Sequence, residues 1–303
     1  MTPANFPLFQ LVMADGVRWH LHAPEEDAGR LLSNFAGLTG LDSPSPPPRT
    51  PPEPGETRKA VIRVGIRNLR WRHFPFEKNG EIQCYLGPVS TPRKMGIQIL
   101  RLARIPAYTC ELQGGLLVHG ALVEKNGLGV ILAGPGGAGK TTAAGRIPHP
   151  WRMLSDDLSL IARSPQGEYW AHPWPTFSRL RLGDLSGRWD VREAVRLGMV
   201  CMLSQHPRDR LHRLSFTHAV GELVEAAGQT RVFMTAEMDE PVARQVNLKR
   251  FHNAAAMAGA LPVYRLQISL TGQFWRTIEE EWETPQSGKI GTTGEPTGCM
   301  GIG

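Results

Sequence analysis

The chain has 303 residues, of which 41% are hydrophobic and 20% are charged, as in ordinary folded proteins. Its 33 glycines and 25 prolines make up about 19% of the residues, against roughly 12% in an average protein, which excludes a compact helical bundle throughout. The formal net charge of +6 raises the question of an acidic partner.

The predicted elements, in chain order, alternate between strands and helices. Strands are expected at 9–13 and 17–22, joined by Asp15-Gly16, then a helix at 25–38, strands at 60–65 and 81–86, and a helix at 96–104. A hairpin at 116–124 and 128–133 turns at Asn126-Gly127, and further strands are expected at 152–155, 158–163 and 169–171. Helices at 192–205 and 217–227, a strand at 262–270 and a helix at 272–282 complete the pattern.

Composition divides the chain into four parts. Residues 1–42 form a small α+β N-terminal region, and the proline-rich residues 43–59 form an extended linker. Residues 60–283 form the main domain of mixed α/β class, and the glycine-rich residues 284–303 form a flexible tail.

The positive charge is concentrated in one stretch. Residues 61–110 hold nine basic and two acidic side chains, so the surplus lies just ahead of the central hairpin. Two interpretations stay open: a solvated basic face, or a docking surface for an acidic protein or peptide. Nucleic acid is disfavoured because no recognised nucleic-acid-binding motif accompanies the stretch.

Cysteine usage and hydropathy indicate a cytoplasmic protein. Cys84, Cys110, Cys201 and Cys299 are widely spaced and lack the pattern of a zinc site. No apolar run reaches the roughly 18 residues of a membrane helix, and the first residues do not resemble a signal peptide. We therefore expect no membrane partner, while the formation of homo-oligomers stays open.

The strongest motif follows the second strand of the central hairpin. The run Gly134, Pro135, Gly136, Gly137, Ala138, Gly139, Lys140, Thr141 fits the phosphate-binding pattern G-x-x-x-x-G-K-[ST], with Thr142 next in the chain. Glycines allow backbone N–H groups to approach phosphate oxygens, Lys140 supplies positive charge, and the Thr141 hydroxyl suits Mg²⁺. This motif predicts ATP and Mg²⁺ as cofactors.

Two adjacent carboxylates follow at the end of the next expected strand. The helix after Lys140 must be short because Pro148 and Pro150 stop it. Asp156 and Asp157 then lie 16 and 17 residues after Lys140. In a mononucleotide site one carboxylate holds the metal and another accepts a proton from an attacking hydroxyl. A capped turn is the alternative interpretation.

These features together resemble the catalytic domain of HPr kinase/phosphorylase. The resemblance rests on His119-Gly120, the glycine-rich loop and Asp156-Asp157, over roughly residues 114–165. It implies an HPr kinase/PEP carboxykinase-like P-loop fold and Mg²⁺/ATP-dependent phosphorylation of a protein serine. It further implies Asp156 as the base, Asp157 with Thr141 as metal ligands, and His119 beside the transferring phosphate, although the two aspartates could exchange roles. The family's later Pro-Gly-Arg segment is absent, which leaves phosphorylase activity in doubt.

A more extensive similarity is to SynChlorMet cassette proteins of the ScmC type, which are HPr-kinase-like. It rests on Pro148–Trp151, Tyr169–Ser178 and Leu261–Tyr264, and it implies a peptide-linked role. Within the second segment, the aromatic and proline-rich run at 170–177 could line a pocket or simply pack in the core.

The sequence therefore predicts an ATP-dependent kinase acting on a serine or threonine of a protein or small precursor peptide. Catalysis is assigned to Asp156, His119 and Lys140, and the acceptor is an acidic protein or peptide for which residues 61–110 are the candidate docking surface. The alternatives are a nucleotide-binding peptide-recognition module without phosphoryl transfer, and a small-molecule kinase.

Overall fold

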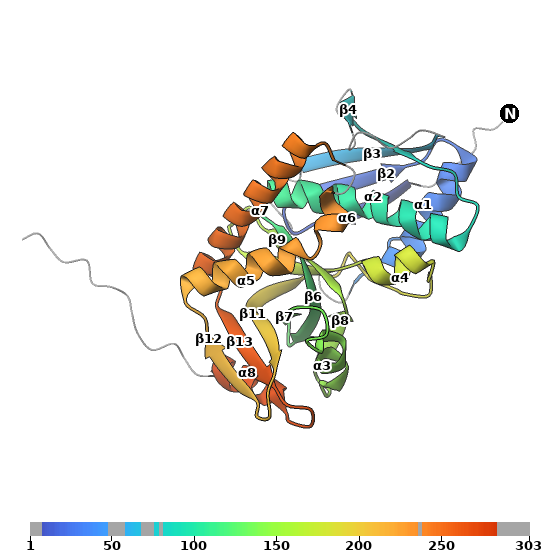
Figure 1. Ribbon diagram of the computed structural model, residues 1–303. Coiled ribbons are helices and arrows are strands. Elements are labelled where there is room, and N and C mark those ends of the chain that lie inside the picture. The colour runs from blue at the N-terminus through green and yellow to red at the C-terminus, as the bar shows by residue number, and fades with distance from the viewer. Residues whose placement is uncertain (1–7, 48–57, 68–75, 79–80, 236–237, 284–303) are drawn as a thin grey trace, which may run out of the picture.

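The computed structural model describes residues 8–47, 58–67, 76–78, 81–235 and 238–283 (Figure 1). Residues 48–57 of the predicted linker and the predicted tail at 284–303 lie outside this part. The described strands form two sheets, which makes the protein mixed α/β as expected. Helices lie between the sheets and on both faces of the second one.

The first sheet belongs to the N-terminal third of the chain. Its strands are, in spatial order, β1 (Leu8–Val12), β2 (Val17–His22), β3 (Arg58–Ile66), β5 (Glu81–Leu86) and β4 (Phe76–Lys78). β2, β3 and β5 run parallel, and β1 and β4 pair antiparallel at the edges. Since β3 pairs directly with β2, the two sides of the proline-rich segment share one sheet.

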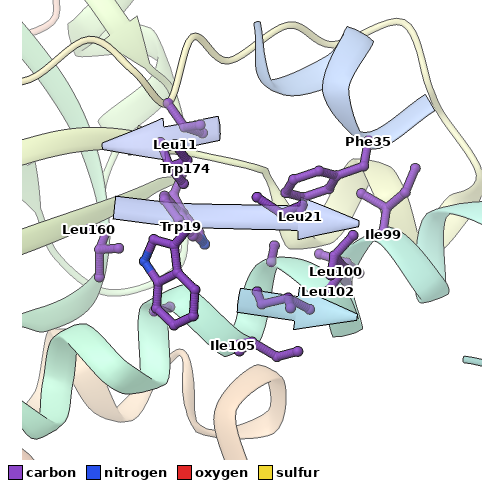
Figure 2. Packing of buried hydrophobic residues seen from close by; sticks show 14 of the residues in the cluster. Leu11, Trp19, Leu21, Phe35, Ile99, Leu100, Leu102, Ile105, Leu160 and Trp174 are labelled. Carbon is purple, nitrogen blue, oxygen red and sulfur yellow. The ribbon is translucent and has the colours of Figure 1, made fainter. Parts of the chain in front are cut away.

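Two helices cover this first sheet, and the longer of them also contacts the second sheet. α1 (Glu26–Thr39) ends at Gly40, whose φ of 74° is the left-handed conformation that glycine adopts readily. α2 (Pro92–Leu112) is longer than the predicted helix at 96–104 and begins at Thr91, whose hydroxyl accepts the Lys94 N–H. Figure 2 shows the shared core, in which Trp19 of β2 and Ile105 of α2 lie with Leu160 of the second sheet.

The second sheet carries the glycine-rich loop. Its order is β10 (Tyr169–Trp174), β9 (Leu158–Arg163), β6 (Leu116–Lys125), β7 (Leu128–Ala133), β11 (Val195–Gln205), β13 (Val263–Ile268) and β12 (Arg210–Arg213), with β8 (Arg152–Ser155) also paired to β6. β10 pairs with both β9 and β11, so these strands, with β6 and β7, form a closed circuit of pairings. The predicted hairpin at Asn126-Gly127 is confirmed, with φ angles of 54° and 85°.

Helices bury both faces of the second sheet. α5 (Phe216–Gly228) and α7 (Glu240–Ala260) pack on one face, through residues such as Leu223 and Met257. α3 (Lys140–Arg146) and α8 (Phe274–Glu283) pack on the other, through Ala143 and Phe274. The short α4 (Phe177–Leu182) and α6 (Arg231–Thr235) lie beside α2 (Figure 1).

The helix predicted at 192–205 is wrong, because most of this segment is strand β11. Its side chains alternate between two cores: Val200 and Met202 face α5 and α7, whereas Cys201 and Leu203 face α3 and α8. A central strand covered on both faces has no polar side, so its sequence reads as an unbroken apolar run. The alternation of β11 side chains between the two faces of the sheet is therefore not visible as a polar/apolar pattern in the sequence.

Among the described helices, none is both long and apolar enough to cross a membrane.

Candidate functional site

The glycine-rich loop connects the end of β7 to the start of α3. Gly134, Gly137 and Gly139 have φ angles of 151°, 79° and 93°, a region that side chains other than glycine rarely adopt. Gly136 and Gly137 at the tip are exposed, and a Cβ there would meet nothing within 4 Å. The loop is thus open on its outer side while its ends are fixed by β7 and α3.

Lys140 lies under the loop. Its Nζ donates to the carbonyl oxygens of Gly134 at 2.9 Å and Pro135 at 3.1 Å, and the residue is only 7% exposed. Burial lowers the pKa of this ammonium, and the nearby Asp157 carboxylate opposes the shift. The Lys140 ammonium is therefore already held at the loop, and its two partners are neutral carbonyl oxygens that an anion could replace.

Asp156 and Asp157 occupy the turn between β8 and β9, directly beside α3. The Thr141 hydroxyl donates to the backbone oxygen of Asp156 at 3.5 Å. Asp156 accepts a hydrogen bond from the Thr176 hydroxyl on Oδ1 at 3.1 Å, which within the described residues is the only one to its carboxylate. The predicted pair thus lies next to the loop, with its two side chains in different surroundings.

Asp157 contacts His119, which lies on β6. The His119 Nε2 is 2.7 Å from Oδ1 of Asp157, and the Ser178 hydroxyl donates to Oδ2 at 3.2 Å. Burial raises the pKa of Asp157, but these hydrogen bonds, with the charges of His119 and Lys140, outweigh it and hold the pKa below its ordinary value. Asp157 is therefore a fixed, ionised carboxylate near Lys140.

The other ring nitrogen of His119 is held from a distant part of the chain. Its Nδ1 lies 2.5 Å from Oε1 of Gln229, just after α5. The neighbouring Gly120 is required by packing, since a Cβ there would lie 2.8 Å from Ile131 Cγ2. The ring of His119 is thus clamped between Asp157 and Gln229.

Ser155, the last residue of β8, has a structural role. It accepts the Leu122 N–H at 3.2 Å and bonds to Ser159, whose hydroxyl donates to the Gly120 oxygen. These bonds hold the aspartate turn against β6, close to His119.

A cavity of about 510 Å³ adjoins the loop on the side of α3. It is lined by Ala138, Gly139, Thr142, Ala143, Arg146, Gln205, His206, Pro207, Ile268, Ser269 and Leu270. Gln205 also donates to the Gly137 oxygen at 3.2 Å, so β11 supports the loop from this side. The sequence indicated Thr142 in this region, but it gave no signal for the residues that follow β11 and β13.

The aromatic run at 170–177 is largely structural. His172 is fully buried, accepts the Ala14 N–H and bonds the Val191 oxygen, and burial lowers its pKa to about 4. Trp174 lies in the core shared with the first sheet. Only the end of the run reaches the site, where Thr176 contacts Asp156.

The structure thus brings Lys140, Thr141, Asp156, Asp157 and His119 together, as the sequence predicted. Thr176 was indicated only as part of the run at 170–177, whose pocket-lining interpretation stayed open. Ser178 and Gln229 were missed because each contacts the site from a distant element. Within the described residues, no cluster of three or more His, Cys, Asp or Glu side chains forms a ready-made metal site.

The fold and the site define a mixed α/β protein with a phosphate-loop sequence between a strand and a short helix, faced by a histidine and two aspartates. Residues 82–283 match the family described as SynChlorMet cassette protein ScmC. The match covers about two thirds of the chain and includes every predicted site residue, so the chain belongs to this family. No curated protein matches the chain.

Proposed function

We propose that this protein is an ATP- and Mg²⁺-dependent kinase that transfers the γ-phosphoryl group to a serine or threonine hydroxyl of a protein or precursor peptide. The observation that carries the proposal is the convergence of a buried lysine, a threonine hydroxyl and two aspartates around one open glycine loop. Phosphoryl transfer depends chiefly on positioning and charge stabilisation, which these groups can supply.

In this proposal the loop and the adjoining cavity hold the nucleotide. Backbone N–H groups of the loop and the start of α3 face the phosphates, and Lys140 exchanges its carbonyl partners for phosphate oxygens. The cavity of about 510 Å³ between α3, Gln205 and Ile268 has room for the nucleoside.

Thr141 and Asp157 are the groups that suit Mg²⁺. Both offer oxygen donors, which Mg²⁺ prefers, and the lowered pKa of Asp157 keeps its carboxylate ionised. Phosphate oxygens and water would complete the coordination shell. The bound ion would neutralise charge on the transferring group.

Asp156 is the proposed general base. The acceptor hydroxyl oxygen forms a bond to the γ-phosphorus while the bond from that phosphorus to the β–γ bridging oxygen breaks. The hydroxyl proton passes to the Asp156 carboxylate, which Thr176 orients through Oδ1, and ADP leaves with the bridging oxygen. In this proposal His119 and Lys140 stabilise charge on the transferring oxygens.

The HPr kinase/PEP carboxykinase-like P-loop fold is part of the same proposal. Its support is the placement of three motifs around β6. His119-Gly120 lies on β6, while the loop follows β7 and Asp156-Asp157 precedes β9, the two strands that pair with β6. The competing function, a nucleotide-binding recognition module without transfer, gains no support from Asp156, because binding alone requires no base.

The test measures transfer of ³²P from [γ-³²P]ATP to serine-containing acidic peptides in the presence of Mg²⁺. Asp156→Asn should reduce transfer by about 100-fold or more while retaining ATP affinity. Asp42→Asn, which changes an exposed carboxylate after α1, is the matched control and should retain transfer. Equal transfer by wild type and Asp156→Asn would exclude this base, and ATP binding without transfer or hydrolysis would favour the recognition module.

A further inference from the structure

A second cavity, the arginine pocket, lies between α2, α4 and α6. Its volume is about 320 Å³. It is lined by Arg93, Ile97, Leu100, Arg101, Arg104, Phe177, Arg181, Val232 and Phe233. Four of these residues are arginines, and none of the described residues that line the pocket carries a carboxylate.

Some residues that line this pocket are close in the chain to residues that contact Asp157 and His119. Ser178 bonds to Asp157, and the preceding residue, Phe177, lines the pocket. Gln229 bonds to His119, and Val232 follows three residues later on α6. The arginine pocket is therefore next to the proposed phosphoryl-transfer site.

The arginines are set at different depths. Arg104 is 2% exposed and its Nη1 lies 3.5 Å from the Phe233 oxygen, while Arg101 donates to Oε1 of Gln98 at 3.2 Å. Arg93 and Arg181 are exposed at the rim, and the Arg181 guanidinium lies over the Phe177 ring. Such planar guanidinium groups match the geometry of a carboxylate and can bind it with paired hydrogen bonds.

The apolar part of the lining favours a peptide over a bare anion. Ile97, Leu100 and Phe233 give the cavity an apolar wall, and Val232 and Leu182 near it are 63% and 78% exposed. A glutamate or aspartate with an apolar neighbour presents both kinds of surface, whereas a nucleic-acid backbone presents repeated phosphates and would not use the apolar wall.

We propose that the arginine pocket binds an acidic side chain of the acceptor peptide, close in sequence to the phosphorylated hydroxyl. This inference rests on the proposed kinase function and specifies its substrate class.

The pocket also identifies which basic residues of the stretch at 61–110 would contact an acidic peptide. Arg63 is paired with Glu81, and Arg67 is paired with Glu25, so both charges are locally compensated. Arg93, Arg101 and Arg104 of the same stretch line one cavity together with Arg181, and of these four Arg93 and Arg181 are exposed at its rim. The arginines at positions 70 and 72 lie outside the described residues.

Binding and transfer are measured with fluorescein-labelled peptides that carry one central serine flanked by glutamates, by alanines or by lysines. Fluorescence anisotropy gives the affinity, and [γ-³²P]ATP gives kcat/KM. Arg93→Gln/Arg181→Gln removes two exposed charges at the pocket rim. Arg188→Gln/Arg244→Gln removes two exposed charges elsewhere and is the control.

The glutamate peptide should bind at least tenfold more tightly than the alanine peptide, and the rim variant should lose that preference while the control keeps it. Equal affinity for the glutamate and alanine peptides, or equal losses in both double variants, would overturn the proposal. So would tighter binding of an oligothymidylate than of the glutamate peptide through the same arginines.

The two proposals fail in different ways. Binding of the glutamate peptide through the rim arginines with no transfer to any peptide contradicts the kinase function and retains the pocket. Transfer that is equally efficient for glutamate and alanine peptides contradicts the pocket and retains the kinase function.

Discussion

The imidazole Nε2 of His119 lies 2.7 Å from Oδ1 of Asp157, and this contact joins β6 to the aspartate turn. It forms where a histidine on the first strand of the central hairpin meets a carboxylate 38 positions later in the chain. Because Gln229 holds the opposite side of the ring, the contact fixes both the histidine and the charge of the carboxylate. The first two predictions concern the groups around this contact.

The stability that Asp157 contributes should depend on pH. Its pKa is held below the ordinary value of 3.8 in the folded protein, so the contribution is fully present above about pH 4 and lost as the pH falls through the lower folded value. Urea unfolding of wild type and Asp157→Asn should therefore show a difference in unfolding free energy at pH 6 that shrinks towards pH 3. A difference that stays constant over this range, or grows as the pH falls, would contradict the pairing.

Lys140→Met should reduce phosphoryl transfer by about 100-fold or more, because the charge at the mouth of the loop is lost. The fold should persist, since among the described residues this side chain bonds only to two loop carbonyls. Lys59→Met, on an exposed position of β3, is the control and should retain transfer. A Lys140→Met protein that transfers phosphate at the wild-type rate would exclude the proposed role of the loop.

Gly96→Ala should destabilise the protein and impair transfer together. A Cβ at Gly96 of α2 would lie 2.0 Å from the Leu180 oxygen, so α4 would have to move, and α4 carries Ser178 on Asp157. We expect a loss of about 1–3 kcal/mol in unfolding free energy and a reduced kcat. Gly221→Ala, at a helical position with nothing within 4 Å, should be neutral or stabilising by about 0.5–1 kcal/mol.

A buried ion pair lies close to Gln229, the residue that holds the His119 ring. Arg250 of α7 donates to Glu111 of α2 at 3.0 Å, with both side chains at most 5% exposed, and it also bonds Thr230 beside Gln229. Burial raises the pKa of Glu111, and Arg250 opposes the shift. Arg250→Met should cost about 3–5 kcal/mol of unfolding free energy, because Glu111 is left buried without this charge partner.

The double variant Arg250→Met/Glu111→Leu provides the control for that measurement. It removes both charges and should recover part of the stability lost in the single variant, as measured by urea unfolding. Additive losses from the two single changes would show that the pair is not energetically coupled.

Much of the fold was predictable because its signals are local. The hairpin turn requires left-handed residues, which Asn126-Gly127 supply, and α3 ends where Pro148 follows. β11 was misassigned because covering helices bury both of its faces, a fact absent from its own residues. α7 was missed although it is 21 residues long, since several apolar side chains such as Leu248 and Phe251 face solvent and blur its apolar stripe.

The sequence by itself determined the chemical groups of the site. The loop glycines, Lys140, Asp156 and His119 lie on or beside β6, β7, β8 and β9 within 39 residues, so the pairing of β6 with these three strands places them together. The tertiary structure decided which groups surround them. Ser178, Gln229 and the arginine pocket reach the site only through the order of the second sheet and the packing of α4 and α6 on α2. Such contacts between distant elements depend on long-range packing, which no local pattern of residues encodes.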